Sequence, residues 1–168
     1  MLRNEDLQIT ELDGGFSVTV CGRANFDYAV PLRELSGKLT AEKWLQIDSE
    51  NCEAMDSTFM GVLTMLALKM RKNGSQVMLI SASDVLLKLL RDLGVAKLFK
   101  VVENPENRVA EGAAVAVNCS NADMLTTAKT VAEAHRTLVE ADQSNAEKFK
   151  QVIEFADQDV ERLEKRSE

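Results

Sequence analysis

Residues 45–63, LQIDSENCEAMDSTFMGVL, decide the fold of this chain. An apolar strand candidate, Trp44–Asp48, leads into a short polar loop that ends in Met55-Asp56-Ser57-Thr58. Apolar residues then recur with helical spacing as far as Arg71, which predicts a helix beginning at Ser57. We therefore expect Ser57 at a helix N-terminus, with its hydroxyl in water and the free backbone N–H groups of the first turn directed outward.

The flanking sequence alternates between strand and helix patterns. In chain order we expect strands at Leu7–Leu12 and Gly15–Cys21, a helix at Val30–Leu39 with Pro31 in its first turn, a strand at Trp44–Asp48, a helix at Ser57–Arg71, a strand at Gln76–Ile80, a helix at Asp84–Leu93 and a strand at Leu98–Val102. This order predicts an α/β fold with a mixed sheet, in which an initial hairpin precedes parallel strands joined by crossover helices.

The chain divides into three parts. Residues 1–103 form the predicted α/β domain, and residues 104–120 form a linker or a segment ambiguous between strand and helix. Residues 121–168 form a helical extension, because no proline or glycine interrupts the sequence from Asn121 to Lys165. Two alternatives stay open for this extension: one long helix with a weak coiled-coil seam, or two helices that turn near 141–145 and fold back on the domain.

Composition excludes several classes of function. The 168 residues carry a net charge of −7 and a pI of about 4.9, which argues against nucleic acid or an anionic membrane surface as the main partner. The sequence has neither a membrane-spanning apolar run nor a secretory signal at its start. Three cysteines and one histidine are too few soft ligands for a zinc site. We expect a cytoplasmic protein with reduced thiols, no metal and no cofactor.

Catalysis is not expected either. The only histidine, His135, lies in the extension, where we expect it on the helix surface or in the helical seam, so the sequence predicts no Ser–His–Asp set. No glycine-rich phosphate loop follows a strand, and the acidic residues are scattered. The sequence therefore favours a protein that is not an enzyme.

Four segments resemble one known family when taken together. They are Val20-Cys21-Gly22-Arg23 after the first long strand, Leu45-Gln46-Ile47-Asp48 in the central strand, the run Met55–Leu63, and Ile80-Ser81-Ala82-Ser83 with the helix and strand that follow. Over residues 7–103 the chain resembles the STAS family, the domains of sulfate transporters and anti-sigma-factor antagonists. It departs from the family pattern at Phe59, where the Asp-Ser-Ser/Thr motif is usually followed by glycine, and the extension lies outside the pattern.

The resemblance implies a bacterial regulator of transcription that acts by switching partners. An anti-sigma-factor antagonist binds an anti-sigma factor or related serine kinase; phosphorylation releases that partner, and a phosphatase restores binding. Ser57 corresponds to the phosphoacceptor. The other residues expected at the partner interface are Asp56, Thr58, Phe59, Asn25, Asp27, Ser81 and Ser83.

A second class of function stays open beside the first. STAS proteins also resemble non-catalytic subunits or scaffolds of larger assemblies, such as ABC lipid-transport complexes or signalling complexes. The long extension favours an assembly role, and it is also a candidate for forming a homo-oligomer or binding a helical partner.

Overall fold

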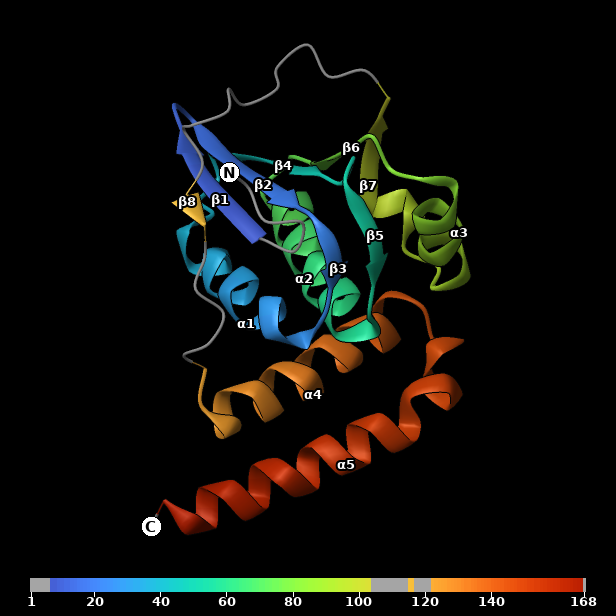
Figure 1. Cartoon of the computed structure of the whole chain (residues 1–168). Helices are drawn as coiled ribbons and strands as arrows, with labels where there is room; N and C mark the ends of the chain where they lie inside the picture. Colours follow the sequence, from blue (N-terminus) through green and yellow to red (C-terminus); the bar gives the residue numbers. More distant parts are fainter. Residues whose placement is uncertain (1–6, 104–114, 117–121, 168) are drawn as a thin grey trace.

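The structure, a computed structural model, describes residues 7–103, 115–116 and 122–167 (Figure 1). Its main sheet has six strands in the order β7-β6-β4-β2-β1-β8. The strands are β1 (Leu7–Leu12), β2 (Gly15–Val20), β4 (Trp44–Asp48), β6 (Val77–Ile80), β7 (Phe99–Val102) and β8 (Val115–Ala116). Strands β2, β4, β6 and β7 are parallel, and β1 pairs antiparallel with β2 and with β8. The predicted hairpin and parallel sheet are confirmed.

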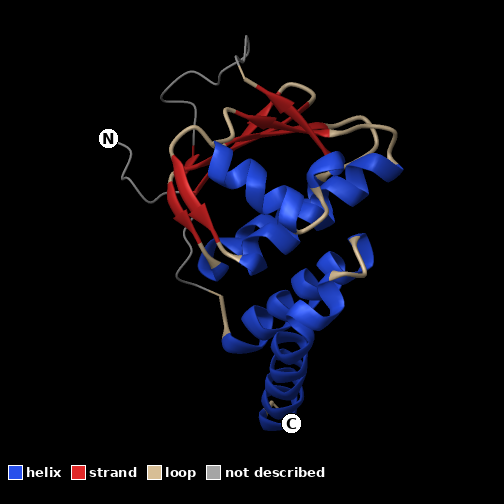
Figure 2. Ribbon diagram, turned by 90° about the vertical axis from the view of Figure 1, so that its right-hand side faces the viewer, coloured by secondary structure: helices blue, strands red, loops and turns tan. Residues whose placement is uncertain are grey.

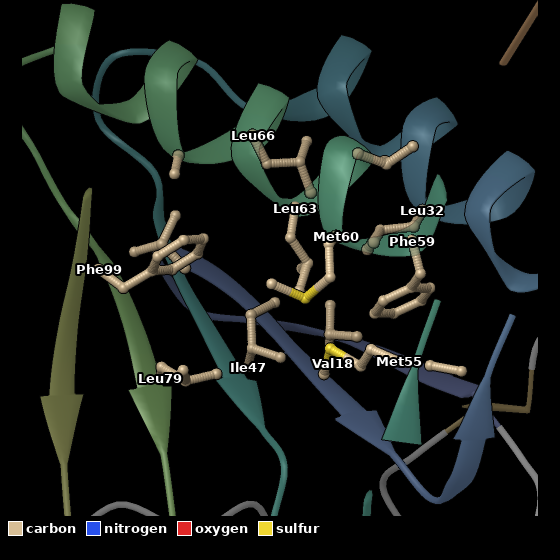
Figure 3. Close-up of a cluster of buried hydrophobic side chains, with 14 of the residues drawn as sticks. Val18, Leu32, Ile47, Met55, Phe59, Met60, Leu63, Leu66, Leu79 and Phe99 are labelled. Atoms are coloured by element: carbon tan, nitrogen blue, oxygen red, sulfur yellow. The ribbon is translucent and has the colours of Figure 1, made fainter. Parts of the chain in front are cut away.

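Three helices, α1 (Phe26–Leu35), α2 (Ser57–Lys72) and α3 (Asp84–Asp92), lie on one face of this sheet (Figure 2). Short 3₁₀ turns follow α1 at Ser36–Lys38 and precede β7 at Ala96–Leu98. The core lies between sheet and helices, where β4 contributes Ile47 and α2 contributes Met60, Leu63 and Leu66 (Figure 3). Burial of this apolar face holds α2 against the sheet and so positions Ser57 at its end.

Two short strands that the sequence analysis did not predict form a separate parallel pair. They are β3 (Gly22–Ala24) and β5 (Cys52–Met55), in which Ala24 pairs with Met55. β5 leads directly into α2, and the backbone N–H of Asp56 donates to the carbonyl of Ala24 (2.9 Å). The pair therefore brings the start of α1 and the start of α2 to one end of the molecule.

Helix α1 begins earlier than predicted. Its N-cap is Asn25, whose side chain accepts from the backbone N–H of Asp27 (3.0 Å), so Pro31 lies inside the helix instead of in its first turn. The prediction for this helix was wrong at its start because it took Pro31 as a first-turn residue and overlooked the local cap at Asn25.

The extension is a helical hairpin. Helix α4 (Met124–Ala141) and helix α5 (Asn145–Arg166) are antiparallel neighbours joined by a short turn, so the two-helix alternative is the one the structure adopts. Asn145, at the start of α5, is fully buried. Its Nδ2 donates to the carbonyl of Leu93 in the α/β domain and to that of Leu138 in α4, both at 2.9 Å, so it joins the turn of the hairpin to the domain. Of the predicted linker, residues 104–114 and 117–120 lie outside the described residues.

Helix α4 packs on α1 and α2 as a further layer, and α5 covers α4 from outside (Figure 2). A bidentate ion pair joins α1 to α4: Arg33 donates to both carboxylate oxygens of Glu133 at 2.8 and 2.7 Å. The extension thus covers the side of the domain on which α2 begins.

Candidate functional site

The candidate site is built around the first turn of α2. Asp56 is the N-cap residue, and its carboxylate accepts from the backbone N–H of Phe59 (2.8 Å). Ser57 is the first helical residue, as predicted. A polar cap followed by an apolar helical run explains both positions, since the cap satisfies a first-turn N–H that has no partner within the helix.

The Ser57 hydroxyl does not project freely into water. Ser57 is partly buried, and its Oγ lies 2.8 Å from Nε2 of His135 on α4. The expectation of a fully exposed hydroxyl is therefore corrected: the extension covers this side chain, and the residue that contacts it lies 78 positions away in the sequence.

The environment of His135 determines the direction of this hydrogen bond. Nδ1 lies 2.7 Å from the Val131 carbonyl oxygen, which can only accept, so Nδ1 carries the proton of the neutral ring. Nε2 then has a free lone pair and accepts from the Ser57 hydroxyl. His135 is 1% exposed and meets the ring of Phe149 of α5 edge-on, with centroids 5.0 Å apart. Of the two expected positions for His135, the surface is wrong, because the residue is buried between helices; its contact with Ser57 was not predicted.

These contacts do not form a hydrolytic triad. In a triad, a carboxylate accepts from Nδ1 of the histidine, whereas here a backbone carbonyl occupies that position and the Asp56 carboxylate binds the first-turn N–H of Phe59. The arrangement holds the hydroxyl in one orientation between two helices. It is a structural contact at the position where the resemblance expects a modification.

Burial changes the proton affinity of both titratable groups at the site. Burial lowers the pKa of His135 below its ordinary value of 6.5, although the Val131 carbonyl and the Asp56 charge act in the opposite direction. Burial also raises the pKa of Asp56, against the effect of its backbone hydrogen bond from Phe59. In both cases the loss of water disfavours the charged form.

The lowered pKa of His135 predicts that acid weakens the structure. As the pH falls below 6.5, the unfolded chain takes up a proton on His135 before the folded chain does, so the free energy of unfolding decreases. Asp56, whose pKa is raised, acts in the opposite direction, but only in the more acidic range where carboxyl groups titrate. Denaturant unfolding at about pH 7.5 and about pH 5.5 should show this loss of stability.

His135→Gln is the control for this effect. His135 is the only histidine in the chain, so the variant should lose less stability than the wild type between the two pH values. Parallel pH profiles for the two proteins would contradict the prediction.

Two of the other residues expected at the interface lie at the same end of the molecule as this site. Asn25 and Asp27 lie at the start of α1, which the β3–β5 pair holds next to Asp56. Asp27 is exposed and Asn25 is partly buried. They and Ser57 thus lie at one end of the molecule.

The remaining expected interface residues have different surroundings. Phe59 is 0% exposed and Thr58 is 6% exposed, so in this conformation neither side chain offers a surface that a partner could contact. Ser83 is exposed and caps α3 by accepting from the N–H of Leu86 (3.2 Å). Ser81 is partly buried and has a positive φ of 55°.

A largely apolar groove of about 270 Å³ lies between β5 and α3. Its lining includes Cys52, Met55, Ser83 and Leu86, so it connects the strand before Asp56 with the start of α3. Burial raises the pKa of the Cys52 thiol to about 11, which keeps it protonated at neutral pH and unreactive as a nucleophile.

Two negative findings concern the described residues. Within 7–103, 115–116 and 122–167, no cluster of three or more histidine, cysteine, aspartate or glutamate side chains has the arrangement of a metal site. Among the helices described, none combines the length and apolar character needed to cross a bilayer.

Comparison with known protein families decides the family. The family model described as "Mlab, STAS domain" matches residues 8–103, which is more than half of the chain. The chain belongs to the STAS family. The resemblance seen in the sequence is confirmed, and the STAS domain contains the whole site except His135 and the residues of α4 and α5 around it. No curated protein matches the chain in a sequence search.

Solved structures agree on the fold. One is the crystal structure of a proposed anti-sigma factor antagonist from Thermotoga maritima, with a TM-score of 0.50 and 14% identity, over 58% of this chain and 86% of that chain. Another is the anti-sigma factor antagonist SpoIIAA in its unphosphorylated form, with a TM-score of 0.47 and 13% identity, over 60% of this chain and 90% of that chain. The family model and the Thermotoga structure together show the STAS fold of the domain, and the C-terminal helical pair is additional to it.

His135 is the residue of the candidate site that the sequence analysis missed. Its only local signal is a polar side chain at an otherwise apolar position of the helical repeat in the extension. That signal indicates a buried polar contact, but it cannot name the contact as Ser57.

Proposed function

We propose that this STAS protein is a non-catalytic regulator, of the anti-sigma-factor antagonist type, whose binding to a protein partner is controlled by phosphorylation of Ser57. The observation that carries the proposal is the position of Ser57 at the first residue of α2, directly after the capping Asp56. A serine kinase would supply ATP and the catalytic machinery. This chain would contribute the hydroxyl and the surface around it.

The physical effect of a phosphate differs between the free domain and a complex. It adds about −1.5 to −2 charges. The N–H groups of an uncovered helix N-terminus stabilise such a charge by about 0.3–1 kcal/mol. In an interface beside Asp56, the same charge meets like charge and loses water. A loss of about 3 kcal/mol would weaken binding more than about a hundredfold.

Phosphosite mapping tests the proposal. The chain is purified from the cells that produce it, and its phosphopeptides are identified by mass spectrometry. We expect phosphate on Ser57, absent from a Ser57→Ala strain. Ser167→Ala is the matched control because Ser167 is an exposed serine at the end of α5, outside the expected partner interface; phosphate on Ser57 should persist in it. Phosphate that persists in the Ser57→Ala strain, or the absence of any phosphate on Ser57 under all growth conditions, would count against the proposal.

A second candidate function is a constitutive subunit or scaffold of a larger assembly, such as an ABC lipid-transport complex. The hydrogen bond that ties the Ser57 hydroxyl to His135 favours it, because a serine held inside the protein needs no kinase to explain it. Isolation of the tagged full chain with its partners separates the two functions. A serine kinase and a phosphatase in the complex support the regulator, whereas a permease and an ATPase support the subunit.

A further inference from the structure

The surface proposed to bind a partner is already covered by a segment of the same chain. We propose that α4, held in place by α5, is an intramolecular occupant of the α2 surface, and that a phosphate on Ser57 displaces it. This inference rests on the proposed function for the origin of the phosphate. The phosphate would then have two opposed effects on a partner: it uncovers the α2 surface, and its charge beside Asp56 weakens binding there.

The fit between α2 and α4 is close. Gly61 lies one turn after Ser57, and a Cβ built on it would lie 2.4 Å from the carbonyl oxygen of Ala134. Real Cβ atoms essentially never approach so closely, so α4 rests directly on the backbone of α2. The Ser57–His135 hydrogen bond forms beside this contact, since His135 follows Ala134. Together the two contacts leave little space between the helices at the Ser57 hydroxyl.

A phosphate would remove the basis of the contact. In the phosphoryl transfer, the bond from Ser57 Oγ to the γ-phosphorus of ATP forms, and the bond from that phosphorus to the oxygen that leaves with ADP breaks. The hydroxyl proton passes to a base of the kinase. The phosphate oxygens would occupy the space between Oγ and Nε2 of His135, which lie only 2.8 Å apart, so the imidazole has to move in either protonation state. The neighbouring Asp56 carboxylate, partly buried like Ser57, adds like charge.

Rotation of the His135 side chain away from Ser57 would cost free energy. Its ring is hydrogen-bonded to the Val131 carbonyl and packs edge-on against Phe149. A rotation would break both contacts and leave buried polar groups unpaired. We therefore expect α4 as a whole to move away from α2. Helix α5 moves with it, because buried side chains of the two helices, including Leu138 and Phe149, belong to one apolar core.

Hydrogen exchange of a chain with phosphoserine at position 57 tests this inference. The full chain is made with phosphoserine inserted during translation, which requires no knowledge of the kinase. We expect the amides of α4 to exchange at least about tenfold faster than in the unmodified chain, while those of β6 and β7 keep their protection. A chain with phosphoserine at position 83 is the matched control and should leave α4 unchanged, since Ser83 is exposed and caps another helix.

The outcomes separate the inference from the proposed function. Unchanged or increased protection of α4 would overturn the inference, because the phosphate would then be accommodated beneath the helix. If the phosphorylated chain also loses protection in β6 and β7, the measurement is repeated on the Ser57→Asp variant, which carries a smaller anion. Faster exchange in α4 alone then supports the inference, and unchanged or increased protection of α4 overturns it. If the phosphoserine chain shows faster exchange in α4 but the protein never carries phosphate on Ser57 in cells, the proposed function is refuted. The inference that a phosphate on Ser57 displaces α4 would still stand.

Discussion

Replacing Phe59 with alanine is expected to lower the free energy of unfolding by about 3–5 kcal/mol, the range found for buried aromatic residues cut back to alanine. The ring is 0% exposed and points toward the sheet among the side chains of the core, near Met55 (Figure 3). Its removal leaves a cavity that the surrounding helices and strands cannot fill without moving. Urea unfolding followed by circular dichroism measures the change, with the midpoint shifted and the slope retained.

Val85→Ala is the matched control for this prediction. Val85 is an apolar residue of α3 that is 73% exposed, so its truncation should change stability by no more than about 0.5 kcal/mol. A Phe59→Ala variant that loses less than about 1 kcal/mol would contradict the assignment of this ring to the core. The prediction matters for function because a partner cannot contact Phe59 while the domain stays folded in this way.

The second large effect is expected at Gly61. In the middle of a helix, glycine to alanine usually stabilises a protein by about 0.5–1 kcal/mol. Here we expect Gly61→Ala to destabilise by about 1–3 kcal/mol, because the added methyl group meets the backbone of Ala134 and forces α4 away from α2. Denaturant unfolding measures the loss of stability, and hydrogen exchange should show reduced protection in α4.

Gly37→Ala is the control for Gly61→Ala. A Cβ at Gly37 would have no heavy atom within 4 Å, and its φ is not in the left-handed region, so this variant should be neutral or slightly more stable. A Gly61→Ala protein that is as stable as the wild type or more stable would show that α4 does not rest on this part of α2. The packing argument for the covered site would then fail.

The local features of the site could be predicted from the sequence. Asp56 lies before an apolar run with helical spacing, and the structure uses it as the cap and Ser57 as the first helical residue. The apolar strands and the first hairpin were predicted for the same reason, since burial of alternate or continuous apolar side chains requires those conformations. Each of these features depends on neighbours a few positions apart.

The features that the sequence analysis missed depend on distant residues. The β3–β5 pair joins Ala24 to Met55 across two short segments of mixed polarity, and neither segment has a strand pattern of its own. The contact of His135 with Ser57 depends on where α4 docks, which in turn depends on the absence of a side chain at Gly61 and on the pairing of Arg33 with Glu133. No periodicity within the extension contains that information.

The sequence is sufficient to predict an acidic chain with a STAS domain, an added helical segment, and a serine that begins the second helix of the domain. Those properties follow from composition, apolar spacing and capping, which act over short stretches of chain. Only the tertiary structure decided that the serine is covered, because cover depends on where a helix about 80 residues further along comes to rest. The same hydroxyl that short-range rules assign to water is therefore held by a buried imidazole.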